Sequence, residues 1–90
     1  MQDFGETQYF NVEAEQETGV QVVLETAYDA LVAKGYNPVN QIVGYIMSGD
    51  PTYITGYNGA RSLMYKIERD EIVEELLTTY IKYRGWDKKK

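Results

Sequence analysis

The feature that most constrains this chain is a run of fifteen residues, 35–49, that carries no charge. It opens the stretch GYNPVNQIVGYIMSGDPTYI in a chain that is otherwise 26% charged. Such a run can be a strand, a membrane segment, a recognition helix or a helix covered on several sides. Asn37 before Pro38 indicates a helix start, because Asn caps free N–H groups and proline fits the first helical position. Ser48 and Gly49 then end a helix of about ten residues, which is too short to span a bilayer.

The remaining helices follow from the same kind of pattern. Thr18 and Gln21 have capping-box spacing, and Lys34 with Gly35 ends the helix that they begin. Asp50-Pro51 predicts one further turn through Ile54. Apolar residues recur at helical spacing in four stripes. These are Val20, Val23, Leu24, Ala27 and Leu31; Val39, Ile42, Val43, Ile46 and Met47; Ala60, Leu63, Met64 and Ile67; and Ile72, Val73, Leu76, Leu77 and Tyr80.

The last two stripes do not lie on one straight helix, because the third would continue at Glu71, Glu74 and Glu75. The chain is therefore expected to bend near residues 68–70, with Asp70 as the N-cap of a final helix that Gly85 ends. The predicted fold class is all-α, a small bundle of about four to five short helices, homodimeric, with a mobile acidic N-terminal leader.

Charge divides the chain into three parts. Residues 1–17 hold five acidic residues and no Lys or Arg, and so carry the whole net charge of −5. We expect a mobile leader over 1–17, a helical domain over 18–85 and a basic tail over 86–90. The N-terminus has no signal-peptide pattern and no run is long enough for a membrane span, so a cytoplasmic location is expected.

The residue inventory removes most catalytic chemistry. There is no Cys and no His, which excludes disulfides, thiolate and imidazole ligands, and histidine-based acid–base catalysis. Glu71, Glu74 and Glu75 are typical of a solvated helix start rather than a metal set. We therefore expect no catalytic residues, no metal, no cofactor and no membrane insertion.

A helix–turn–helix nucleic-acid binder is the alternative from another class. Its second helix would need cations for phosphates and polar side chains for bases. Residues 38–47 offer only Asn40 and Gln41, in an acidic chain. A helix covered by a second copy of the chain fits better, because so short a chain cannot cover several helix faces alone. The residues expected in the dimer interface are Val39, Ile42, Val43, Ile46, Ile72, Leu76 and Tyr80.

The stretch KGYNPVNQIVGYIMSGDPTYI, with Ala60-Arg61 and ERDEIVEEL at 68–76, resembles the IreB/ReoM family of small regulatory phosphoproteins of Gram-positive bacteria. The resemblance implies a helical homodimer without catalytic activity that is a substrate of membrane Ser/Thr kinases with extracellular PASTA repeats. It also implies control of cell-wall precursor synthesis, including Clp-protease turnover of the enzyme for the first committed step. The family's phosphoacceptor is a leader threonine, which Thr7 matches.

The chain departs from the family at Gly56 and Tyr65, where relatives often carry basic residues. Arg61, Lys66 and Arg69 remain as a positive cluster that avoids the apolar stripe. We hypothesise that these three residues bind partner proteins and that phospho-Thr7 competes for them or redirects them, since phosphate adds charge that arginine pairs with in a forked geometry.

Overall fold

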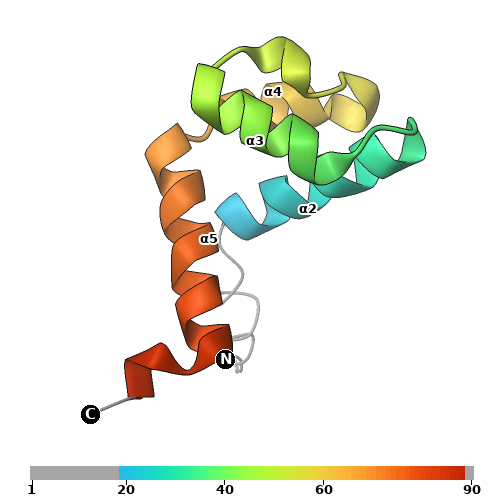
Figure 1. Cartoon of the computed structure of the whole chain (residues 1–90). Coiled ribbons are helices and arrows are strands. Elements are labelled where there is room, and N and C mark those ends of the chain that lie inside the picture. Colours follow the sequence, from blue (N-terminus) through green and yellow to red (C-terminus); the bar gives the residue numbers. More distant parts are fainter. Residues whose placement is uncertain (1–18, 89–90) are drawn as a thin grey trace, which may run out of the picture.

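The computed structural model describes residues 19–88, which form helices joined by short turns (Figure 1). The elements are α2 (Gly19–Ala33), α3 (Pro38–Ser48), the 3₁₀ turns Pro51–Tyr53 and Tyr57–Gly59, α4 (Ala60–Tyr65), α5 (Arg69–Arg84) and the 3₁₀ turn Trp86–Lys88. The all-α fold class is confirmed: there are four α-helices and no strand within residues 19–88.

The helices form a body and an arm. Helices α2, α3 and α4 pack together, while α5 leaves this body at a steep angle and runs past the start of α2 (Figure 1). The core lies inside the body and receives one residue from α5. Its members are Val23, Ala27, Ala30, Leu31, Tyr45, Ile54, Ala60, Met64 and Ile72. Because Ile72 has 0% exposure, the first turn of α5 belongs to the core although most of that helix does not.

The local signals at the helix ends are confirmed. The Asn37 side chain accepts a hydrogen bond from the Asn40 N–H at 3.0 Å, so it caps α3 as its position before Pro38 predicts. Gly49 and Gly85 end α3 and α5 with φ of +77° and +74°, a conformation that glycine adopts without strain. The expected turn after Asp50 is the 3₁₀ turn, whose Thr52 N–H and hydroxyl both donate to the Asp50 carboxylate.

The bend before the last helix is also confirmed, but Asp70 as its N-cap is wrong. Helix α5 begins at Arg69, and its N-cap is Glu68, which has extended backbone. Glu71, three residues on, accepts a hydrogen bond from the Glu68 N–H at 3.2 Å. This reciprocal capping favours a start one turn before Glu71, and it places Asp70 inside the helix.

The inner face of α3 differs from the one that its apolar stripe predicts. Tyr45 is the buried residue of this helix, whereas Val39 and Met47 are 69% and 77% exposed. Ile42 and Ile46 are half-buried against the core. Since Tyr45 stands three residues after Ile42, the packed face is rotated toward the 3₁₀ turn that follows α3.

Three expectations fall partly or wholly outside the described residues. These are the Thr18 cap, the character of the leader over 1–17, and the last two residues of the basic tail. Within residues 19–88, none of the helices combines the length and the apolar character needed to cross a membrane.

The attachment of α5 to the body predicts the effect of shortening Ile72. Replacing this fully buried side chain by alanine (Ile72→Ala) should lower the free energy of unfolding by about 2–5 kcal/mol, because it leaves a cavity in the core. The control is Val32→Ala, at a half-exposed position, where a change within about 0.5 kcal/mol is expected. Urea unfolding at fixed protein concentration measures both, and equal losses would contradict this view of the core.

Candidate interaction surfaces

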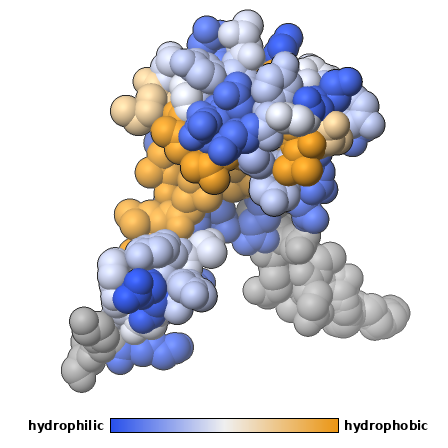
Figure 2. All heavy atoms as spheres, turned by 45° about the vertical axis from the view of Figure 1, so that its right-hand side comes forward, coloured by the Kyte–Doolittle hydropathy of each residue, from blue (hydrophilic) through white to orange (hydrophobic). Residues whose placement is uncertain are grey.

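An apolar groove lies in the angle between the arm and the body. Two adjoining hollows, of about 340 and 460 Å³, share Leu24 and Leu76. The first is also lined by Tyr28, Pro38, Val39, Ile42, Val43 and Ile46, and the second by Gln21, Glu75, Thr79, Tyr80 and Tyr83. We call these two hollows together the apolar groove. Figure 2 shows hydrophobic surface running from the arm onto the underside of the body.

Large apolar side chains remain accessible along this groove and beside it on α5. Val43, Leu76 and Tyr80 are about half exposed, and so is Leu77 on the adjoining face. Soluble monomers rarely expose a contiguous apolar surface of this kind, and such surfaces mark interaction sites. Ile72, expected in the same interface, is completely buried and therefore contributes to the core rather than to an exposed surface.

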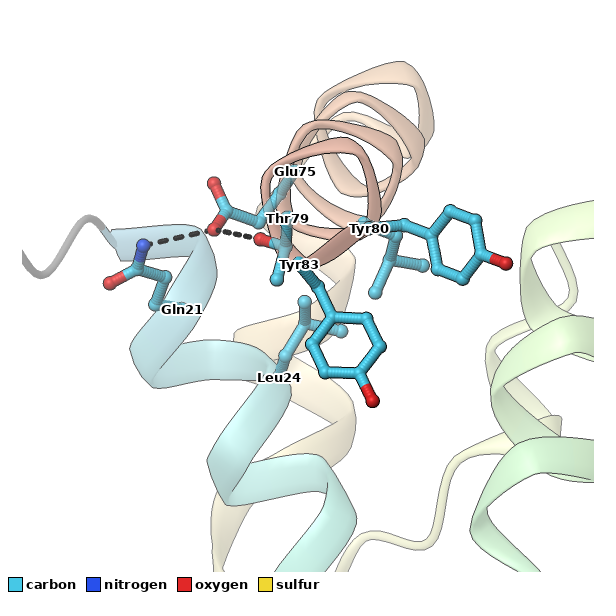
Figure 3. Close-up of a pocket in the computed structure, with 7 residues that line it drawn as sticks. Gln21, Leu24, Glu75, Thr79, Tyr80 and Tyr83 are labelled. Atoms are coloured by element: carbon cyan, nitrogen blue, oxygen red, sulfur yellow. Dashed lines mark hydrogen bonds between the residues drawn. The ribbon is translucent and has the colours of Figure 1, made fainter. Parts of the chain in front are cut away.

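A polar contact fixes the end of the groove where α2 meets α5 (Figure 3). The Gln21 Nε2 donates a hydrogen bond to Glu75 Oε2 at 2.9 Å, and the Thr79 hydroxyl donates to the same oxygen at 3.3 Å. The Tyr83 ring lies beside Leu24, while Tyr80 projects from α5 in another direction. The arm is therefore tied to α2 at its middle as well as to the core at its start.

Arg61 and Arg69 are exposed, and both are also hydrogen bonded to backbone carbonyl groups outside their own helices. Arg61 Nε donates to the Ile54 carbonyl at 2.7 Å, and Arg69 Nη1 donates to the Ile46 carbonyl at 3.0 Å. Arg69 thereby links the start of α5 to the last turn of α3, whose carbonyls lack partners within their own helix. Both arginines hold the body together in addition to presenting charge.

Lys66 differs from the two arginines. It is exposed just after α4, and within residues 19–88 its ammonium group makes no hydrogen bond or ion pair. Thr7 lies outside the described residues. Glu71 and Glu74 are exposed on α5, and no three acidic side chains within residues 19–88 are placed to hold a metal ion.

Several residues of the groove were not expected from the sequence. Leu24 and Tyr28 come from α2 and Tyr83 from the end of α5, and they line the groove because α5 folds back past α2. Leu24 belongs to the predicted apolar stripe of its helix, and this pattern could have indicated that it packs against another element. No sequence pattern shows which helix faces meet when the connecting bend sets the angle between them.

Together, the fold and the apolar groove define a small all-α protein whose accessible features suit binding to other proteins. Comparison with known proteins identifies the family. Residues 5–82 match the model of the IreB regulatory phosphoprotein family, so the chain belongs to that family. A relative from Lachnoclostridium phytofermentans, named UPF0297 protein, is 62% identical over 81 residues, which cover 90% of this chain and 92% of the relative.

The backbone contacts of Arg61 make a prediction about stability. Arg61→Ala should lower the free energy of unfolding by about 1.5 kcal/mol, because it removes a charge-assisted hydrogen bond to the Ile54 carbonyl. Lys66→Ala removes a cation from the same region without such a bond and should change stability by less than about 0.5 kcal/mol. Urea unfolding measures the free energy of unfolding of both variants. Equal values would show that the Arg61 contact contributes nothing to stability.

Proposed function

We propose that this chain is a non-enzymatic regulatory phosphoprotein of the cytoplasm, and that a PASTA-type Ser/Thr kinase modifies it on Thr7 and a phosphatase reverses the modification. It acts by binding proteins that control cell-wall precursor synthesis, including Clp-protease turnover of a wall-synthesis enzyme. The observation that carries this proposal is the family match, which begins at residue 5 and so includes Thr7.

The threonines within the α-helices are poor acceptors by comparison with Thr7. A kinase needs a hydroxyl that it can reach in an extended segment. Thr26 lies within α2, where its hydroxyl donates to the Val22 carbonyl at 2.9 Å, and Thr79 lies within α5, where it donates to Glu75. Modifying either residue would require local unfolding of a helix.

The proposed assembly is a symmetric homodimer joined through the apolar groove. A second copy suits this surface because each chain presents both an apolar groove and an apolar arm. A two-fold axis brings the same apolar surface of the two chains together. The interface would contain Val39, Ile42, Val43, Ile46, Leu76 and Tyr80, while Ile72 supports the arm from within the core. The exposed cations Arg61, Lys66 and Arg69 lie outside the linings of the groove and would remain available for other proteins.

The modification site is tested directly by mass spectrometry. After treatment with a PASTA-type kinase and ATP, phosphate should be found on Thr7, and Thr7→Ala should abolish the modification. Circular dichroism should show the same helical content before and after treatment, because Thr7 lies outside the helices α2 to α5. Phosphate found chiefly on Thr18, Thr26, Thr78 or Thr79 would contradict the proposal.

The homodimer is tested by light scattering coupled to size exclusion, which should give twice the 10.4 kDa mass of the chain. Val43→Glu places a charge in the apolar groove and should yield a folded monomer, because burying an unpaired carboxylate is unfavourable. Val32→Glu is the matched control, since Val32 is 50% exposed against 51% for Val43 and lies outside the groove linings. A wild-type monomer at high micromolar concentration, or equal behaviour of the two variants, would refute the assignment.

A further inference from the structure

A polar hollow of about 350 Å³ lies where the end of α3 meets the start of α5, apart from the apolar groove. It is lined by Tyr45, Gly49, Tyr65, Ile67, Glu68 and Arg69. We call it the polar hollow. Unlike the apolar groove, it is surrounded by groups that can donate or accept hydrogen bonds, so it suits a polar ligand rather than an apolar surface.

Tyr45 is the unusual residue of this hollow. It is only 3% exposed, and its hydroxyl has no hydrogen-bond partner within residues 19–88. Because hydroxyl groups of buried residues are nearly always paired, the partner of this one is expected to be water or a ligand in the hollow. A tyrosine hydroxyl is protonated at neutral pH and able to donate, and burial raises the pKa of Tyr45 further above its ordinary value.

Arg69 supplies positive charge beside this hydroxyl. Its guanidinium group lies against Gly49, where a Cβ would stand 2.9 Å from Arg69 Cζ, so only glycine leaves room for it there. Arginine has five N–H donors. One hydrogen bond, from Nη1 to the Ile46 carbonyl, holds the group in place, and within residues 19–88 its other donors have no hydrogen-bond partner. A fixed guanidinium beside an unpaired hydroxyl is an arrangement suited to an oxyanion.

Glu68 is the one acidic residue of the lining. Its carboxylate weakens the attraction for an anion, and it therefore provides a test, since removing its charge should strengthen anion binding. Tyr65 adds a second, more exposed hydroxyl to the lining.

We propose that the polar hollow binds a phosphate monoester, with the Tyr45 hydroxyl and the Arg69 guanidinium as donors, and that phospho-Thr7 of the same chain supplies the phosphate. The choice of phospho-Thr7 as the source rests on the proposed function, whereas the binding site itself does not. Residues 1–17 hold five acidic residues and no Lys or Arg, so no cation of this segment competes with Arg69 for the phosphate.

The leader is long enough to reach the polar hollow. Gln21, near the start of α2, contacts Glu75 of α5. Arg69 lies six residues before Glu75 on the same helix, a rise of about 9 Å. The twelve residue steps from Thr7 to Gly19 span up to about 40 Å when extended.

Two measurements on the full chain separate the site from its source. First, inorganic phosphate is added to the unphosphorylated protein while the backbone N–H resonances of Gly49 and Arg69 are followed by NMR. A saturable shift is expected, with chloride at equal ionic strength causing none. Tyr45→Phe keeps the ring in the core and should weaken phosphate binding about tenfold, because it removes one hydrogen bond to a charged group. Tyr36→Phe, at an exposed tyrosine outside the hollow, should bind as wild type does.

Second, phosphothreonine is installed at residue 7 by protein ligation, so that no kinase is needed, and its second pKa is measured by phosphorus NMR. Contact with Arg69 and Tyr45 favours the dianion and should lower this pKa by about one unit relative to the urea-unfolded chain. Tyr45→Phe should return the pKa toward the unfolded value. Glu68→Gln should lower it further.

Each outcome decides one part of the proposal. Phosphate binding that is lost in Tyr45→Phe, together with an unchanged pKa of phosphothreonine, would overturn the leader as the source. No response in either measurement, or equal responses of Tyr45→Phe and wild type, would overturn the site itself. Failure of a kinase to modify Thr7 would overturn the proposed function while leaving both measurements valid.

Discussion

The contact on which the rest of this structure depends is the attachment of α5 to the body at its first turn. Ile72 is wholly buried in the core, and Arg69 holds the Ile46 carbonyl of α3 at 3.0 Å. Beyond this turn, the Gln21–Glu75 hydrogen bond is a further contact that fixes the arm beside α2. These contacts hold the arm at an angle to the body, and the apolar groove lies within that angle. The same first turn forms one wall of the polar hollow, so both surfaces depend on it.

Local signals predicted the helices well because each signal acts over a few residues. Asn37, before Pro38, caps the start of α3, as expected. Gly49 and Gly85 end α3 and α5, also as expected. Asp70 failed as an N-cap because two caps competed within three residues. The reciprocal contact available to Glu68 and Glu71 favoured the earlier one. The burial of Tyr45 was missed because a hydropathy stripe counts apolar residues, whereas a tyrosine ring packs in the core as a large apolar group.

The surfaces were less predictable, since they depend on contacts between distant parts of the chain. The apolar residues of α3 and α5 indicated an interface, but the contribution of Leu24 and Tyr28 from α2 follows from the bend that brings the arm past that helix. Arg61 and Arg69 were correctly placed on the surface. Their partners, the Ile54 and Ile46 carbonyls, lie 7 and 23 residues earlier in the chain, so spacing along one helix could not show them. Charge reversal at these arginines therefore alters structural contacts together with surface charge, and Lys66 is the cleaner position for testing charge alone.

The position of Arg69 joins the two surfaces in one energetic relation. Its guanidinium lines the polar hollow and also binds α3 to the start of α5, and both helices line the apolar groove. A ligand bound to the other donors of Arg69 would favour the position of the arm in which this hydrogen bond is made. If the proposed second copy of the chain binds best with the arm in that position, the ligand and the second copy raise each other's affinity by the same factor. The proposed modification of a leader threonine thus has a physical route to assembly and partner binding, through one side chain and without any catalytic group.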